Sequence, residues 1–226
     1  MSSALAALVF AVAAAPAAAA DAERLYQEGV AIAATIDDAS VFRKAGLARD
    51  MRDAWLQAVA LDPDHARARV SLFQFYLAAP GIIGGGRDKA LGELAHIARI
   101  ADARPDDLAL RLDHGLLCQS VDDWACAAAA FELVVAKDPG AMMAWYQIGR
   151  TALRSGAQLE RGAEALERYL THTPGDGEPS RAWGYTRLGQ VYAAQGRPAD
   201  ARAAIEAALA LEPDHEEAKK ALEALP

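Results

Sequence analysis

The feature that most constrains this chain is a pattern of residue types that recurs about every 34 residues. Two copies share the same order of small, large apolar and proline positions. Leu188, Gly189, Tyr192, Ala201, Ile205, Ala208 and Pro213 align with His114, Gly115, Cys118, Ala127, Phe131, Val134 and Pro139. A third copy carries Gly149, which lies one full period after Gly115. This period predicts a solenoid, in which each unit is a helical hairpin that buries its apolar face only against its neighbours.

Turn and stop signals divide each unit into two helices. Alanine, the strongest helix former, supplies 56 of the 226 residues. Pro198 follows a Gln-Gly-Arg turn and suits the first turn of a helix, where its missing N–H costs nothing. Asp-Pro or Glu-Pro steps close the units, because the residue before proline is pushed out of helical geometry. These steps are Asp62-Pro63, Asp138-Pro139 and Glu212-Pro213.

With these positions assigned, the pattern resembles the tetratricopeptide repeat (TPR), most closely at residues 182–215. The resemblance, to secreted bacterial TPR proteins, implies an all-α fold. We expect a right-handed α-solenoid of about five TPR-like helical hairpins with a C-terminal capping helix. The expected units span residues 22–65, 66–107, 108–141, 142–177 and 182–215, and the capping helix spans residues 216–225.

The N-terminal segment, residues 1–20, has the features of a signal peptide. It carries no charged side chain, and the apolar run from Leu5 to Ala15 precedes Ala18 and Ala20, a small-x-small pattern before Asp21. The run is too short and too rich in alanine to span a membrane. A secretory leader normally also carries Lys or Arg, which residues 1–20 lack. We therefore expect a TPR solenoid domain at residues 21–226, periplasmic or secreted after cleavage and without a stable membrane span. An uncleaved anchor or a disordered leader is the alternative.

The charge balance and the absence of catalytic motifs limit the function. The formal net charge is −8, which argues against nucleic acid as a partner because phosphate binding depends on clustered Lys and Arg. No Gly-x-Ser-x-Gly or His-Glu-x-x-His spacing occurs. We therefore expect a non-enzymatic adaptor or scaffold of the periplasm or cell envelope, with a protein or peptide partner and no cofactor.

The peptide Pro80–Ala90, with three successive glycines, supports an alternative function. The spacing from Gly81 to Gly86 resembles the opening of a phosphate-binding loop, but Arg87 and Asp88 stand where such a loop needs Lys and then Ser or Thr. The simpler interpretation is a turn that needs positive backbone φ angles. A small-molecule-binding or enzymatic protein using the Gly81–Gly86 loop is the alternative to the adaptor.

The two cysteines fall in one predicted hairpin, late in its first helix and early in its second. Cys118 and Cys126 form either a disulfide or a pair of buried free thiols. His114 lies one turn before Cys118, so the three residues offer three metal ligands, but no fourth ligand is evident and we expect no metal.

The TPR resemblance also implies a binding surface on the concave face, which first helices line. Carried over by register, the candidate protein-binding residues are Gln74, Tyr146, Arg150, Trp183, Arg187 and Gln190. Arginine forks and aromatic rings are frequent anchors for acidic side chains or a terminal carboxylate. The alternative is that these are ordinary helix-face residues.

Overall fold

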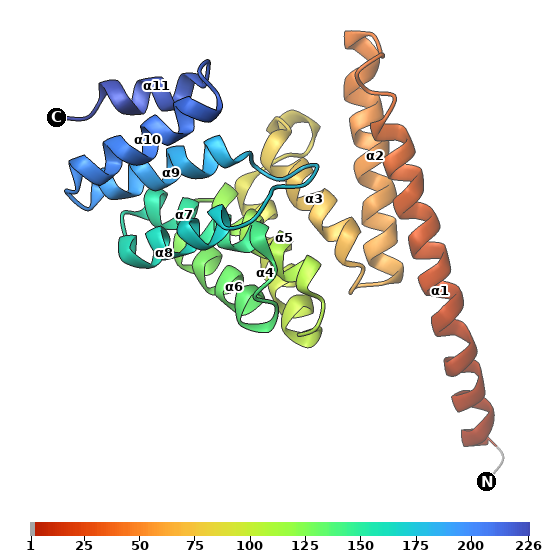
Figure 1. Cartoon of the computed structure of the whole chain (residues 1–226). Helices are drawn as coiled ribbons and strands as arrows, with labels where there is room; N and C mark the ends of the chain where they lie inside the picture. Colours follow the sequence, from red (N-terminus) through yellow and green to blue (C-terminus); the bar gives the residue numbers. More distant parts are fainter. Residues whose placement is uncertain (1–2) are drawn as a thin grey trace. The chain divides into compact units, whose positions relative to one another are not determined.

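The computed structural model describes residues 3–226, with side chains from residue 17 onward except that of Val41. The described chain consists of helices, turns and loops, with no strand between residues 3 and 226. Consecutive helices pair into hairpins (Figure 1), and contacts cluster into two compact units, residues 1–105 and 106–226. Among the residues described, no helix has the length and apolarity that a membrane span requires.

The first unit contains two helical hairpins. In the first hairpin α1 (Ser3–Ala33) packs against α2 (Val41–Leu61), and in the second α3 (Ala66–Ala78) packs against α4 (Arg87–Ala103). A short 3-10 helix, η1 (Gly81–Ile83), lies between α3 and α4. The backbone of α1 continues through the predicted cleavage point before Asp21; residues 1–2 of the predicted signal peptide, and the side chains of residues 3–16, lie outside the described part.

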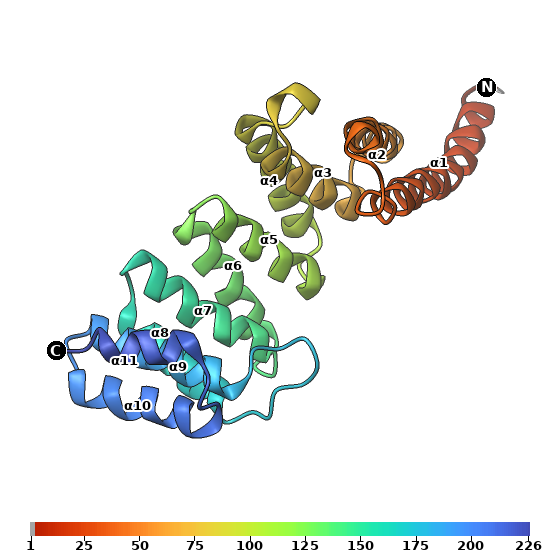
Figure 2. The same ribbon diagram turned by 90° about the horizontal axis from the view of Figure 1, so that it is seen from above.

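The second unit contains three hairpins and a terminal helix. The hairpins pair α5 (Leu108–Ser120) with α6 (Trp124–Lys137), α7 (Met142–Ser155) with α8 (Leu159–Leu170), and α9 (Arg181–Ala194) with α10 (Pro198–Leu211). The last helix, α11 (Glu216–Glu223), packs against both α9 and α10, as Figure 2 shows.

Side-chain caps fix where several of these helices begin. Asp107 and Asp123 accept hydrogen bonds from the backbone N–H groups of Leu110 and Cys126, each 3.0 Å away. Such caps satisfy amides that the first turn leaves without helical partners. These two aspartates therefore cap the starts of α5 and α6.

Glycine inside the hairpins allows helices to approach closely. The Cα of Gly149 in α7 faces Leu166 in α8, and a Cβ added at Gly149 would lie 2.3 Å from the Leu166 Cγ. Leu166 is fully buried, together with Tyr169 of the same helix. The small residues of the repeat thus leave room for large side chains from the facing helix, which is how the second unit forms its core.

Candidate functional site

The clearest candidate site in the second unit is an arginine held by two glutamines. Arg150 lies on α7, and its Nη1 donates to the Oε1 of Gln119 on α5 at 3.1 Å and to the Oε1 of Gln147 at 3.4 Å. Arg150 is exposed, whereas both glutamines are only 6% exposed. Within residues 106–226, no carboxylate lies within ion-pair distance of Arg150. The guanidinium is therefore oriented by neutral groups and keeps its charge available.

A buried hydrogen bond holds the glutamine of α5 in place. The Nε2 of Gln119 donates to Thr151 Oγ1 at 2.8 Å, and the Thr151 hydroxyl donates to the Gln147 carbonyl oxygen at 2.7 Å. Thr151 is 2% exposed. Buried polar groups of this kind are costly unless they are paired, so the paired set fixes the side-chain positions beside Arg150.

The candidate residues of α9 are engaged by the C-terminal helix. Arg187 Nη1 lies 3.2 Å from Glu217 Oε1, which also accepts a hydrogen bond from Gln190 Nε2 at 3.1 Å. The guanidinium of Arg187 stacks over the Trp183 ring, and that ring packs edge-on against His215 with centroids 4.3 Å apart. The hydrogen bond from Gln190, with the Arg187 charge, holds the pKa of Glu217 below its ordinary value.

Two other candidate residues occupy different surroundings. Tyr146 is only 6% exposed and packs against Tyr169, with ring centroids 5.2 Å apart, in the core formed by α7, α8 and α9. The repeat register predicts an exposed ring for Tyr146, but the ring packs inside the core. Gln74 on α3 is exposed and belongs to the first unit. The structure therefore brings together Arg150 with two glutamines, and separately Trp183, Arg187 and Gln190.

Gln119 and Gln147, which orient Arg150, are not among the residues predicted from the sequence. Both are buried, each 6% exposed. A glutamine at a position where the repeat register predicts burial is the sequence signal that could have identified them, since a buried amide needs a polar partner.

The amides of the three successive glycines are already hydrogen-bonded within the loop. The backbone N–H groups of Gly84, Gly85 and Gly86 donate to the carbonyl oxygens of Gly81, Pro80 and Tyr76, at 3.0, 3.2 and 2.8 Å. Arg52 Nη1 donates to the Ile83 carbonyl oxygen at 2.9 Å, and Lys89 Nζ donates to that of Gly84 at 2.8 Å. Since phosphate loops bind through free amides, this arrangement supports the interpretation of the loop as a turn.

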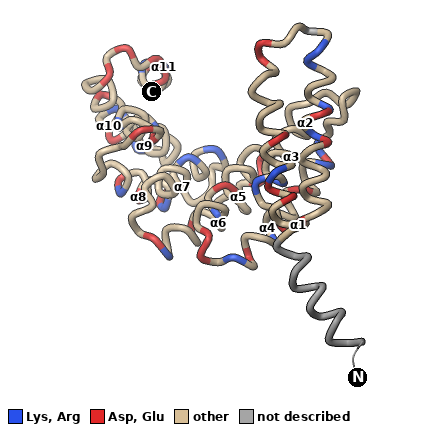
Figure 3. The backbone as a smooth tube through the Cα atoms, turned by 90° about the vertical axis from the view of Figure 1, so that its right-hand side faces the viewer, with Lys and Arg blue, Asp and Glu red and all other residues tan. Residues whose placement is uncertain are grey.

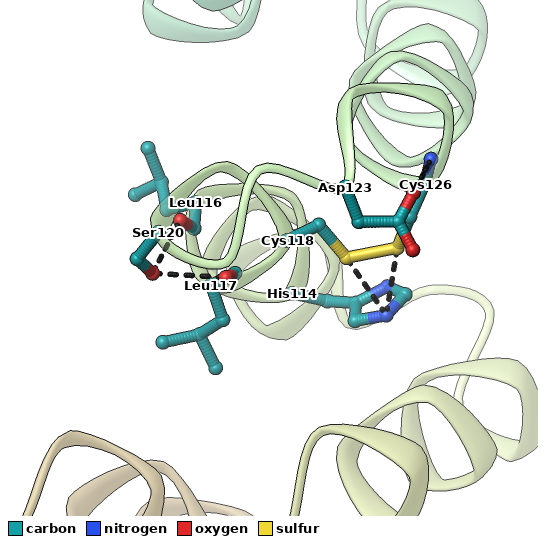
Figure 4. The surroundings of a disulfide bond; sticks show 7 residues. All are labelled: His114, Leu116, Leu117, Cys118, Ser120, Asp123 and Cys126. Carbon is teal, nitrogen blue, oxygen red and sulfur yellow. Dashed lines mark hydrogen bonds between the residues drawn. A yellow bond between two sulfur atoms is a disulfide. The ribbon is translucent and has the colours of Figure 1, made fainter. Parts of the chain in front are cut away.

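A disulfide joins Cys118 on α5 to Cys126 on α6, with the Cα atoms 5.8 Å apart. His114 places its Nε2 3.5 Å from the Sγ atom of each cysteine (Figure 4). Cys118 and His114 are buried, and Cys126 is half-buried. Of the alternatives that the sequence left open, the structure therefore contains the disulfide.

Comparison with known proteins identifies the repeat. Residues 182–215 match the family model of the tetratricopeptide repeat, and these residues form the hairpin of α9 and α10. No curated protein matches the sequence closely enough to show a relationship.

Solved structures share the fold at low sequence identity. The structure of YrrB, described as a TPR protein with an unusual peptide-binding site, is 16% identical, covers 78% of this chain and 84% of its own, and has a TM-score of 0.60. MamA residues 41 to the end from Desulfovibrio magneticus RS-1 are 15% identical, with coverages of 87% and 98% and a TM-score of 0.61. TPR-like repeats of a putative kinesin light chain from Podosopora anserina are 18% identical, with coverages of 86% and 98% and a TM-score of 0.61.

These comparisons show one repeat and the fold. Residues 182–215 match the TPR model, the chain shares the fold of solved TPR structures, and the expected all-α solenoid of TPR-like hairpins with a C-terminal capping helix is confirmed.

Proposed function

We propose that the chain is a non-enzymatic scaffold that binds an acidic segment of a protein partner, with Arg150 as the anchor on the α7 face of the second unit. The supporting observation is the exposed guanidinium of Arg150, which hydrogen-bonds Gln119 and Gln147 and has no carboxylate partner among residues 106–226. An arginine fork held in this way can bind a carboxylate through two parallel hydrogen bonds.

Arg150 is a better anchor than Arg187. Arg187 already pairs with Glu217, so a partner carboxylate would have to displace that contact. Arg150 would exchange only water for the incoming carboxylate, because its protein contacts use Nη1 and leave the rest of the fork exposed. Less reorganisation leaves more of the contact energy for binding.

Charge and fold also support a protein partner. Acidic and basic residues are interspersed along both units (Figure 3), which suits protein contacts better than a nucleic-acid backbone. The structure of YrrB is described as having a peptide-binding site. TPR solenoids offer their stacked first helices as extended surfaces for such segments.

We propose a periplasmic or envelope location from two features. Residues 1–20 have the apolar run and small-x-small pattern of a leader. The disulfide between Cys118 and Cys126 is a bond that persists mainly in oxidising compartments.

The test is peptide binding to the chain from residue 21 onward, using acidic peptides with free C-terminal carboxylates selected from a display library. Arg150→Ala is expected to weaken binding at least about tenfold, the cost of losing a charge-assisted bidentate contact. Arg154→Ala is the matched control, since Arg154 is exposed on the same helix but stacks over the Trp124 ring. Equal affinities of the Arg150→Ala variant and the unmodified chain would refute the anchor.

A further inference from the structure

His114 and the two cysteines of the disulfide together offer the ligand atoms of a metal site. His114, Cys118 and Cys126 each offer one ligand atom, and these atoms all lie within 4.8 Å of one another. His114 and Cys118 are four residues apart on α5, so one helix face presents both. Cys126 reaches the same point from the first turn of α6 (Figure 4).

The disulfide makes this ligand set redox-dependent, because a thiolate and not a disulfide sulfur binds metal. A dithiol can open the bond: the Cys118–Cys126 bond breaks, two electrons and two protons pass to the cysteine sulfurs, and the dithiol becomes a disulfide. Metal binding to the two thiols then releases their protons to water.

The imidazole already lies where a metal ligand would. In a tetrahedral zinc site with Zn–S near 2.3 Å and Zn–N near 2.0–2.1 Å, neighbouring sulfur and nitrogen ligands lie about 3.5 Å apart. The Nε2 of His114 is 3.5 Å from the Sγ of Cys118 and 3.5 Å from that of Cys126. Only the two sulfur atoms have to separate once the bond between them is broken.

Charge favours a divalent ion, and two thiolates with an imidazole are ligands that zinc prefers. His114 is 7% exposed and Cys118 is fully buried, so a site with net charge would be costly there. Zn²⁺ with two thiolates and a neutral imidazole has no net charge, whereas a monovalent ion would leave one negative charge. We propose that reduction of the disulfide creates a Zn²⁺ site formed by His114, Cys118 and Cys126, with the fourth position open on the half-buried side of Cys126. This inference does not depend on partner binding.

The test compares the reduced and the oxidised full chain. The chain is reduced with a dithiol, freed of it by anaerobic desalting, and titrated with Zn²⁺ against a chromophoric chelator, and with Co²⁺ as a spectroscopic probe. We expect one ion per reduced chain, with thiolate-to-cobalt charge-transfer absorption, and at least 100-fold weaker binding by the oxidised chain. Equal binding by the two forms would overturn the proposal.

Two variants separate the roles of the ligands. His114→Ala is expected to weaken Zn²⁺ binding to the reduced chain at least tenfold, whereas His96→Ala, at an exposed position on α4, is the matched control and leaves it unchanged. Because His114 is buried, Cys126→Ser provides a second test that spares the core. It is expected to lose most of the charge-transfer absorption while keeping its helical circular dichroism. Retention of full Zn²⁺ affinity by either folded variant would contradict the assignment.

Discussion

Arg187 of α9 and Glu217 of α11 form an ion pair, with Nη1 and Oε1 3.2 Å apart. Gln190 donates to the same carboxylate oxygen. The terminal helix α11 thus contacts Arg187 and Gln190, two residues that the repeat register predicts to bind a partner. A sequence pattern gives the face on which a residue lies, but whether another helix covers that face depends on a contact between segments that are distant in the sequence.

The Glu217 contact predicts a modest, pH-dependent contribution to stability. Because the pKa of Glu217 is lowered in the folded chain, its stabilisation is present above the ordinary pKa of 4.5 and is lost as the pH falls through the folded value. Glu217→Gln is expected to lower the free energy of unfolding by less than about 1 kcal/mol at pH 7, since the pair is partly exposed. Urea unfolding at pH 7 and pH 3 measures the difference, which should shrink at pH 3.

The control for Glu217→Gln is Glu206→Gln, at an exposed position on α10. It is expected to leave the free energy of unfolding unchanged at both pH values. If Glu217→Gln lowers the free energy of unfolding as much at pH 3 as at pH 7, the carboxylate charge is not the source of the effect.

The disulfide is expected to stabilise the second unit. It closes a short loop, with a sequence separation of 8 between Cys118 and Cys126, and loop-closure entropy gives about 2–3 kcal/mol for such a loop. Thermal unfolding with and without a dithiol should show a lower midpoint for the reduced chain. Cys126→Ser should unfold like the reduced chain, with no further change when the dithiol is added; a large additional shift would mean that the reductant acts elsewhere.

The close approach at Gly149 predicts that an added methyl group destabilises the second unit. The Cβ in Gly149→Ala would lie 2.3 Å from Leu166 Cγ, and because Leu166 is fully buried, its side chain would have to repack within the core. Overpacking of this kind costs about 1–3 kcal/mol, to be measured by urea unfolding. Gly92→Ala, in the helix α4 with nothing within 4 Å of the added Cβ, should instead gain about 0.5–1 kcal/mol.

The helices could be predicted from the sequence because their signals are local. Pro198 opens α10, and α6 and α10 end at Lys137 and Leu211, just before the Asp138-Pro139 and Glu212-Pro213 steps. Each signal acts through the backbone of one or two residues. The helix bounds therefore follow the repeat register closely.

The candidate site was harder to predict, because its residues depend on contacts between helices. Tyr146 and Arg150 are one turn apart on α7, yet Tyr146 packs on Tyr169 while Arg150 is exposed. Gln119 fixes Arg150 from the preceding hairpin. Side-chain rotation and contacts with a neighbouring repeat decide both relationships, so the place of a residue within its own repeat does not establish them.

The glycine loop allows a matched test of why its glycines are present. A Cβ added at Gly85 would lie 1.7 Å from the carbonyl oxygen of Ala79, a backbone atom that no side-chain rotation can move. Gly85→Ala is therefore expected to destabilise the first unit by about 3 kcal/mol or more. Gly81→Ala in the same loop meets nothing within 4 Å, so it should be neutral or gain up to about 1 kcal/mol by restricting the unfolded chain.

Hydrogen exchange separates a structural role of this loop from a binding role. If Gly85 serves the backbone turn, Gly85→Ala should speed exchange of the Gly86 amide, which donates to the Tyr76 carbonyl oxygen, because the clash displaces the loop from α3. The Gly81→Ala variant should keep that amide protected. Equal protection of the Gly86 amide in both variants would mean that the loop tolerates the methyl group, and the packing explanation for Gly85 would then fail.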